Sequence, residues 1–235
     1  HSLPGLENLA LIPGTVGAAP IQNIGAYGLE VGEYIQSIEV YDCHSKTVVN
    51  LPASECAFTY RNSIFKVHPN RYIITRVYFY LPAVWTPRLH YADLAAVFAS
   101  DHAPTAEEMM VAVCKIRNRK LPDPKLIGNA GSFFQNPIVE QSQYLQLLEQ
   151  FPELVSYPEG NEREGKRKLA AGWMIDRCGF KGMRSGAVGV YEHQALVIVN
   201  HGGGCADSVM ALAKTIQDKV HHTFGVALLI EPTRY

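Results

Sequence analysis

Hydrophobic and polar positions alternate in the first half of the chain. Residues 36–42 alternate apolar with polar side chains, and residues 71–81 are rich in β-branched and aromatic side chains. Both patterns are typical of strands in a sheet. The polar segment 44–46 predicts a turn that leads into a further strand at 47–49.

Helical spacing replaces this alternation further along. Thr105 followed by Glu108 matches a capping box, which predicts a helix over roughly residues 106–118. Gly179 suits the position just after a helix. The same criteria predict the remaining elements: helices at 141–150, at 169–178 and from a Ser208 cap to about residue 221, and strands at 195–200 and 224–230.

This order of elements predicts an α+β fold with two regions. A chain of 235 residues can form one large domain or two modest ones. Pro122 and Pro124 end the helical pattern, so we place a boundary there. The last strand is expected to return to the first region. The predicted domains are therefore 1–121 with 223–235, and 122–222.

Composition narrows the classes of function. Hydrophobic residues make up 47% and charged residues 18%, which is ordinary for a soluble globular protein, and the net charge of −1 gives no basic field for nucleic acid. The five cysteines are odd in number and show no metal-ligand spacing, which indicates free thiols in a reducing compartment and no metal site. With no long apolar run and no signal peptide, we expect a cytoplasmic protein without a membrane partner.

A loop of small residues is the first candidate site. Residues 11–28 read LIPGTVGAAPIQNIGAYG. Small residues let a backbone approach a flat or phosphorylated cofactor. The segment matches neither the P-loop nor the G-x-G-x-x-G pattern, and taken alone it is better explained as a tight structural loop between elements.

Two further motifs hold single reactive side chains. Arg61, beside a tyrosine in YRNSIFK, could bind a carboxylate, or lie over apolar neighbours at the surface. Ser132, in GNAGSFFQNP, is not in a G-x-S-x-G nucleophile motif. Its hydroxyl could give a proton to a very basic carbon, or could serve only the turn.

Charged groups provide the last candidates. Glu231 follows an apolar run and could act as an acid, or could pair with Arg234 at a strand edge. A basic run could bind a diphosphate or complement a helix dipole. Its members are Lys115, Arg117, Arg119, Lys120 and Lys125.

Taken in order, these segments resemble the UDP-N-acetylenolpyruvoylglucosamine reductase family. The resemblance extends from residue 12 to residue 232, and the order of the motifs makes it specific. The matching segments are IPGTVGAAPIQNIGAYG, YRNSIFK, LPDPKLIGNAGSFFQNP, KLAAGWMID followed by KGM, HQALVIVN and FGVALLIEP.

This resemblance implies an activity and a fold. The family uses NADPH and FAD to reduce UDP-N-acetylglucosamine enolpyruvate to UDP-N-acetylmuramate for cell-wall synthesis. Residues 1–121 with 223–235 would form the second part of a two-subdomain FAD-binding region of the vanillyl-alcohol-oxidase type. Residues 122–222 would form the substrate-binding domain. We expect a monomer.

The resemblance also assigns residues. Arg61 and Glu231 would stabilise negative charge on the substrate, and Ser132 would donate the proton. Tyr91, in TPRLHYADL, resembles a tyrosine on a loop that closes over the substrate diphosphate in one subclass. The other substrate-binding candidates are Lys120, Asn136, Tyr157, Lys168 and Gln194. The FAD-lining candidates are Ile12, Pro13, Gly14, Ala19, Ile21, Gln22 and Gly25.

Two departures from the family keep alternatives open. Nothing matches the family's N-terminal glycine-rich loop for the FAD diphosphate, and the chain starts at His1 without a methionine, so we expect a chain that begins inside a longer protein. Pro232 and Thr233 also shift Arg234 relative to Glu231. The alternatives are an oxidase with the same FAD fold and an inactive UDP-sugar-binding fragment.

Overall fold

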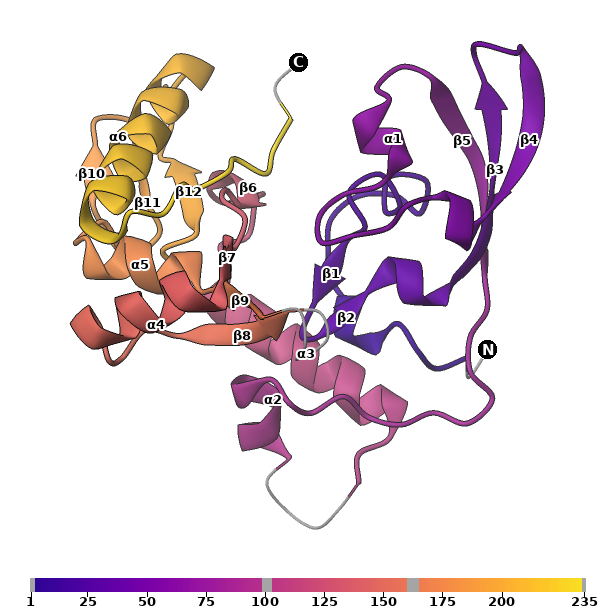
Figure 1. Cartoon of the computed structure of the whole chain (residues 1–235), viewed down its shortest axis with the longest axis horizontal. Helices are drawn as coiled ribbons and strands as arrows, with labels where there is room; N and C mark the ends of the chain where they lie inside the picture. The colour runs from indigo at the N-terminus through magenta and orange to yellow at the C-terminus, as the bar shows by residue number, and fades with distance from the viewer. Residues whose placement is uncertain (1–2, 99–102, 160–164, 234–235) are drawn as a thin grey trace. The chain divides into compact units, whose positions relative to one another are not determined.

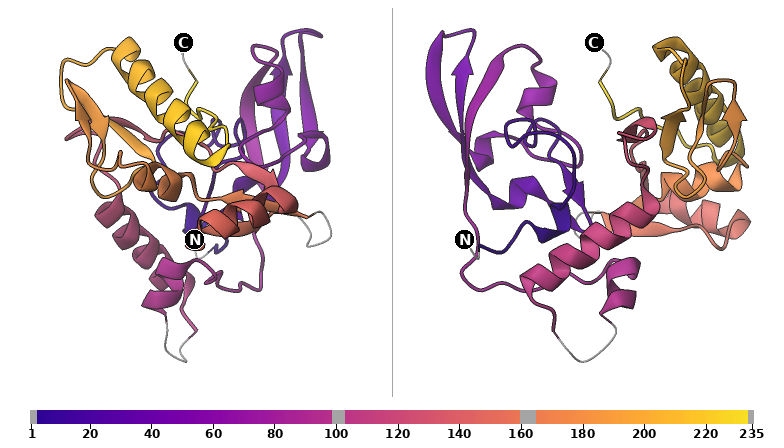
Figure 2. Two further views of the ribbon diagram at one scale, coloured as in Figure 1. Left: turned by 60° about the vertical axis from the view of Figure 1, so that its left-hand side comes forward. Right: turned by 180° about the vertical axis from the view of Figure 1, so that it is seen from behind.

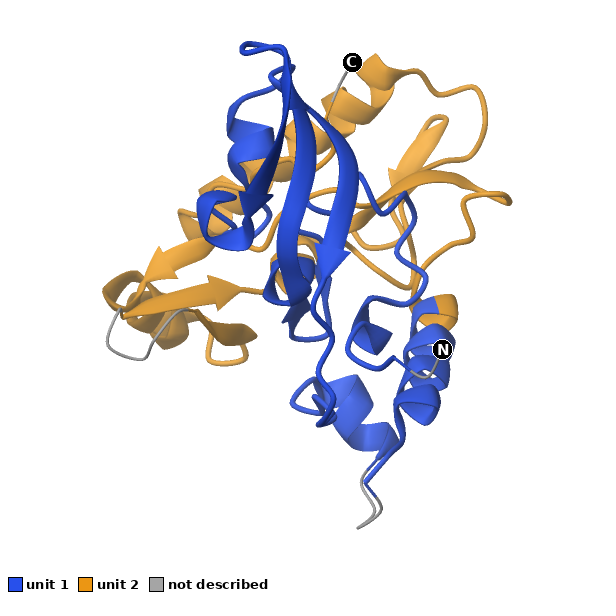
Figure 3. Cartoon of the chain, turned by 90° about the vertical axis from the view of Figure 1, so that its right-hand side faces the viewer, with its two compact units in different colours: residues 1–117 blue, residues 118–235 orange. Residues whose placement is uncertain are grey.

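The chain forms two compact units in the computed structural model, which describes residues 3–98, 103–159 and 165–233 (Figure 1). Unit 1 contains residues 1–117 and unit 2 contains residues 118–235 (Figure 3). Helices and strands occur in both units, so the predicted α+β class is confirmed.

Unit 1 is built on an antiparallel sheet of order β4-β3-β5. Ile38 and Val40 of β3 are fully buried, whereas their neighbours Glu39 and Tyr41 are partly exposed, as the alternating sequence predicts. The sheet strands are β3 (Ile35–Asp42), β4 (Thr47–Pro52) and β5 (Tyr72–Phe79), and the helices around them are η1 (Glu7–Leu9), η2 (Val31–Tyr34), η3 (Ala53–Glu55) and α1 (Ile64–Val67).

A small hairpin precedes the sheet. Strands β1 (Gly25–Ala26) and β2 (Leu29–Glu30) are antiparallel and are joined by two residues, Tyr27 and Gly28. Both have positive φ, 50° and 79°, as a type I′ turn requires. Residues 11–24 form successive turns without a strand or an α-helix.

Two helices complete unit 1. Helix α2 (Ala92–Val97) packs on α3 (Ala106–Lys120) through buried apolar side chains such as Leu94 and Met109. The predicted capping box is confirmed, because Glu108 N–H donates to Thr105 Oγ1 at 3.2 Å and Thr105 N–H donates to Glu108 Oε2 at 2.8 Å. Helix α3 continues from unit 1 into unit 2.

Unit 2 contains two antiparallel sheets, of order β10-β11-β12-β6 and β7-β9-β8. Helix α6 packs against β11 and β12 (Figure 2). The strands are β6 (Gly128–Ser132), β7 (Ile138–Glu140), β8 (Ser156–Glu159), β9 (Lys166–Leu169), β10 (Arg184–Ser185), β11 (Val188–Val190) and β12 (Val197–Asn200), and the helices are α4 (Gln141–Gln150), α5 (Ala171–Arg177) and α6 (Ala206–Phe224).

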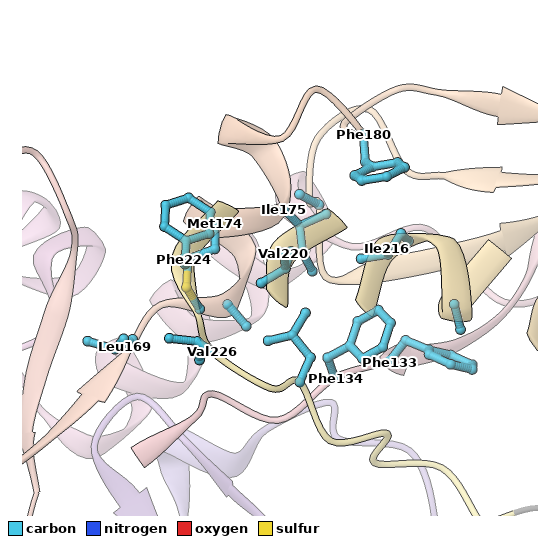
Figure 4. Close-up of a cluster of buried hydrophobic side chains, with 14 of the residues drawn as sticks. Phe133, Phe134, Leu169, Met174, Ile175, Phe180, Ile216, Val220, Phe224 and Val226 are labelled. Atoms are coloured by element: carbon cyan, nitrogen blue, oxygen red, sulfur yellow. The ribbon is translucent and has the colours of Figure 1, made fainter. Parts of the chain in front are cut away.

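The core of unit 2 brings together helices, strands and the C-terminal segment (Figure 4). Phe134 is 1% exposed, and Met174, Ile175 and Ile216 are fully buried. Val226, beyond α6, lies in the same cluster. Burial of this much apolar surface is the main stabilising contribution to such a unit.

Helix α6 begins at a different cap from the predicted one. Its N-cap residue is Cys205, and Ser208 lies in the first turn with its Oγ 3.3 Å from Cys205 Sγ. The prediction was wrong because it relied on the usual preference for serine at this position. The helix ends at Phe224, where Gly225 takes the left-handed conformation with φ 65°.

The C-terminal segment differs from the predicted strand 224–230. Among the described residues, its β-type pairing is a single bridge between Phe134 and Ile230. The segment belongs to unit 2 rather than to the region of residues 1–121. Val226 and Leu228 are buried in the unit 2 core, which explains the placement. The division between the units falls after Arg117, within α3.

Candidate functional site

The small-residue loop of unit 1 is tied to the turn that carries Arg61. Ser63 Oγ donates to the Ile21 carbonyl at 2.6 Å, and Arg61 Nη2 donates to the Gly25 carbonyl at 2.7 Å. Ser63 is fully buried and is also the N-cap of α1. Two sequence segments that the resemblance assigned to cofactor binding and to catalysis are therefore joined by hydrogen bonds within unit 1.

Asn23 joins the same two segments to the hairpin. Its Nδ2 donates to Glu30 Oε2 at 2.7 Å and to the Thr59 carbonyl at 3.1 Å, and its Oδ1 accepts the Gly32 N–H at 2.8 Å. Asn23 is 2% exposed and has φ 47°, a conformation that asparagine tolerates better than most residues. The sequence analysis did not select Asn23. The only sequence feature that could have indicated it is its place inside the small-residue loop.

Gly25 is a cofactor candidate whose lack of a side chain serves Arg61. A Cβ atom at this position would lie 2.9 Å from Arg61 Nη1 and 2.9 Å from the Leu29 carbonyl oxygen. Arg61 has φ 53°, and its guanidinium carbon lies 4.9 Å from the centre of the Tyr60 ring. Only glycine leaves the guanidinium room to reach this backbone.

The other FAD-lining candidates differ in exposure. Gly14 has φ 121° with open space beside it, and Ile21 is 41% exposed. Pro13 is exposed, and Ile12 and Gln22 are half-buried. Ala19 is buried in the core of unit 1, so a contact from it would involve the backbone. Two apolar residues outside the predicted set, Leu11 and Val16, are 54% and 60% exposed on the same loop.

Arg117 lies against this loop. Its Nη2 donates to the Leu11 carbonyl at 3.4 Å, and its Nε is buried without a hydrogen-bond partner among the described residues. Burial lowers the pKa of the Arg117 guanidinium from its ordinary value. The sequence analysis treated Arg117 only as one member of a basic run. The structure places its guanidinium against the Leu11 carbonyl, with the Nε group buried.

Tyr91 lies in unit 1, where its ring packs on the hairpin. It precedes α2 as the N-cap residue, and its ring meets Tyr27 edge to face with centroids 5.3 Å apart. Its neighbour His90 packs on Gly28. The predicted loop tyrosine therefore lies beside the Gly25–Glu30 hairpin.

Unit 2 holds the other two catalytic candidates on adjacent chain segments. Ser132 is exposed at the end of β6, where it is the register partner of Val197. Glu231 N–H donates to the Phe133 carbonyl at 2.9 Å, so Glu231 lies beside the residue that follows Ser132. Arg234, the alternative partner of Glu231, lies outside the described residues.

Two substrate candidates lie at the start of α5. Asn136 Oδ1 accepts the Ala171 N–H at 2.9 Å, and Gln194 Oε1 would be 3.1 Å from a Cβ atom at Gly172. Gln194 Oε1 also accepts the Leu196 N–H at 3.3 Å. The structure thus brings together two residues that are far apart in the sequence.

Two more candidates face each other in the β8–β9 pair. Tyr157 and Lys168 are register partners, and Lys168 Nζ donates to Glu159 Oε2 at 2.6 Å. Lys120 ends α3 and is half-buried.

The described parts of the chain contain no group of three or more His, Cys, Asp or Glu residues placed to hold a metal ion. None of the described helices is long and apolar enough to cross a membrane.

Comparisons with known proteins identify the class and the family. Residues 123–235 match the model of the UDP-N-acetylenolpyruvoylglucosamine reductase C-terminal domain. A protein of Polynucleobacter asymbioticus named UDP-N-acetylenolpyruvoylglucosamine reductase is 65% identical over 232 residues, covering 99% of this chain and 66% of its own length. A protein of the same name from Ralstonia nicotianae is 57% identical, covering 98% and 67%.

Both relatives are named as reductases, which are oxidoreductases. The chain belongs to the UDP-N-acetylenolpyruvoylglucosamine reductase family. It spans about two thirds of the length of these relatives (66% and 67%).

A solved structure supports the fold. The crystal structure of UDP-N-acetylenolpyruvylglucosamine reductase from Thermus caldophilus aligns with a TM-score of 0.62 at 24% identity. The alignment covers 97% of this chain and 63% of that one. The chain therefore has a mixed helix and sheet fold similar to that crystal structure, as the family resemblance predicts.

Proposed function

We propose that the complete protein carrying this chain uses NADPH and FAD to reduce UDP-N-acetylglucosamine enolpyruvate to UDP-N-acetylmuramate. The observation that carries the proposal is 65% identity, over 99% of the chain, to a relative named for this reductase activity. A cytoplasmic monomer that supplies a cell-wall precursor is part of the same proposal.

The loop at residues 11–25 fits a flavin nucleotide. Gly14 leaves open space beside the backbone, and Leu11, Val16 and Ile21 offer exposed apolar surface. Arg117 adds a buried donor without an acceptor among the described residues. A flat ring system with carbonyl and phosphate oxygens needs apolar contact and hydrogen-bond donors of these kinds.

The proposed chemistry assigns a task to each catalytic candidate. FAD, when bound, would supply hydride for the enolpyruvyl methylene carbon. Arg61, as a cation, and Glu231, as a protonated acid that donates a hydrogen bond, would stabilise the negative charge that develops on the substrate carboxylate and its α-carbon. Ser132 would donate its hydroxyl proton to that α-carbon, where a weak acid suffices because the carbon is strongly basic.

The substrate candidates would position the nucleotide sugar. Lys120 and Lys168 carry the positive charge suited to phosphate or carboxylate oxygens. Asn136 and Gln194 offer amide groups at the start of α5, and Tyr157 lies beside Lys168. Tyr91 would close over the diphosphate from its segment of unit 1.

A half-reaction experiment tests the proposal. In the complete protein with FAD, Ser132→Ala should leave flavin reduction by NADPH near normal. It should slow flavin reoxidation by substrate about 10²- to 10⁴-fold, the usual contribution of a proton donor. Anaerobic stopped-flow absorbance follows both steps. Ser185→Ala, an exposed strand serine in β10, is the matched control.

Other results would contradict the assignment. Equal loss of both half-reactions in Ser132→Ala would make Ser132 a structural residue. Rapid reoxidation by oxygen, with no response to the substrate in the unmodified protein, would favour the oxidase alternative. Failure of the complete protein to take up flavin would favour the UDP-sugar-binding alternative.

A further inference from the structure

Arg88 lies three residues before Tyr91 and binds the hairpin on which Tyr91 rests. Its Nη1 donates to the Gly28 carbonyl at 2.9 Å and to Glu33 Oε1 at 3.1 Å, and its Nη2 donates to Glu33 Oε2 at 2.6 Å. Two parallel bonds between a guanidinium and a carboxylate fix geometry better than a single charge contact.

The carboxylate that receives Arg88 is itself held in place. Glu33 Oε1 accepts the Glu30 N–H at 2.9 Å in a capping box at the start of η2. Glu30 also accepts from Asn23, the buried hub of the candidate cofactor loop. Arg88 is therefore connected to that loop through two carboxylates and one amide.

The residues that follow Arg88 also contact the hairpin turn. The imidazole of His90 lies 3.3 Å from the position of a Cβ atom at Gly28, and the Tyr91 ring packs on Tyr27. Before Arg88, Trp85 Nε1 donates to Glu7 Oε2 at 3.2 Å. Between β5 and α2 the segment has no regular structure, and Val84 is 86% exposed. Side-chain contacts such as these therefore hold the segment.

We infer that Arg88 is a positioning residue for Tyr91: by binding Glu33 and the Gly28 carbonyl, it holds the Tyr91 segment against the Tyr27–Gly28 turn. The inference rests on the proposed function for the role of Tyr91 in substrate binding. It adds a residue outside the substrate and cofactor sets, acting through Tyr91 rather than on substrate.

Two tryptophans allow the position of the segment to be measured without turnover. The 235 residues of this chain contain two tryptophans, Trp85 and Trp173, so within this chain Trp173→Phe leaves Trp85 as the single reporter. In this background, Arg88→Leu should increase acrylamide quenching of Trp85, and Arg88→Lys should recover part of the protection. Arg76→Leu, which removes a similar two-bond pair with Glu39 on another part of unit 1, should leave quenching unchanged.

Substrate kinetics of the complete protein with FAD give the second measurement. Arg88→Leu should raise KM for the UDP-sugar by up to about fivefold, the effect of losing one partly exposed ion pair, with flavin reduction by NADPH unchanged. Arg76→Leu should not change KM. Increased quenching together with the higher KM supports the inference.

Two results would overturn it: equal quenching in Arg88→Leu and Arg76→Leu, or increased quenching without a change in KM. If the unmodified protein does not respond to the substrate, the proposed function fails instead. The quenching comparison then still decides whether Arg88 holds the segment.

Discussion

The candidate residues of the two units are held in place by different physical means. In unit 1, buried polar side chains such as Asn23 and Ser63 hold the loop and the Arg61 turn through hydrogen bonds. In unit 2, Ser132 and Glu231 flank Phe133 and Phe134, whose rings pack into a large apolar core.

This difference predicts different sensitivities. A hydrogen-bonded frame depends on the chemical identity of a few buried atoms, because an unpaired buried polar group is costly. An apolar core depends on shape and volume and tolerates changes of identity that conserve both. Loss of volume should therefore damage unit 2 most, and loss of a donor or acceptor should damage unit 1 most.

The largest expected effect is from Phe134→Ala in unit 2. Phe134 is 1% exposed, and removing its ring should lower the free energy of unfolding by about 3–5 kcal/mol through lost burial and a cavity. Urea denaturation followed by Trp173 fluorescence in a Trp85→Phe background measures this unit. Leu229→Ala, in the paired segment but 64% exposed, should change it by less than about 0.5 kcal/mol. Equal effects would show that packing does not hold this segment.

A smaller loss is expected from Asn23→Ala in unit 1. The substitution leaves the Gly32 N–H and the Thr59 carbonyl without their partner, at a cost of about 1–3 kcal/mol. Trp85 fluorescence during denaturation, in the Trp173→Phe background, reports on this unit. The exposed Asn50→Ala is the control. If Asn23→Leu retained full stability, shape rather than hydrogen bonding would hold the loop.

The smallest effect concerns a charged pair of unit 1. Hydrogen bonds from Arg71 and from the His44 N–H hold the pKa of Asp42 below its ordinary value. A lowered pKa in the folded state means that this stabilisation is present above the unfolded value of about 3.9 and is lost as pH falls through the folded pKa.

Asp42→Asn should therefore reduce the dependence of Tm on pH in the range below the unfolded value of about 3.9. Thermal unfolding of the single-tryptophan Trp85 protein measures it. Asn50→Ala, at an exposed position of β4 in the same unit, is the control. An unaltered slope in Asp42→Asn would mean that the pair contributes nothing to folding.

Local patterns predicted most of the elements. Residues 36–42 and 71–81 became β3 and β5 because alternation and β-propensity agree there, and Thr105 with Glu108 capped α3. The N-cap of α6 and the last segment were predicted wrongly. Cys205 rather than Ser208 caps the helix, and Val226 and Leu228 pack in the unit 2 core, a tertiary effect that local pattern does not contain.

The candidate site was less predictable than the fold. Family motifs selected Arg61, Ser132 and Glu231, whose roles stay predictions. They did not select Asn23, Ser63 or Arg88, because these side chains act through partners distant in the sequence: Asn23 on Thr59, Ser63 on Ile21, and Arg88 on Gly28 and Glu33. Such pairings depend on the folded chain.

The boundary between the units has a practical consequence for dissecting the protein. It falls between Arg117 and Asn118 inside the continuous helix α3, where the backbone is hydrogen-bonded. Proteases usually cleave exposed, mobile linkers, so limited digestion should spare this bond. Any attempt to express residues 118–235 alone would truncate a helix. A cut after residue 120, just before the Pro122 and Pro124 stretch, would keep α3 whole with unit 1.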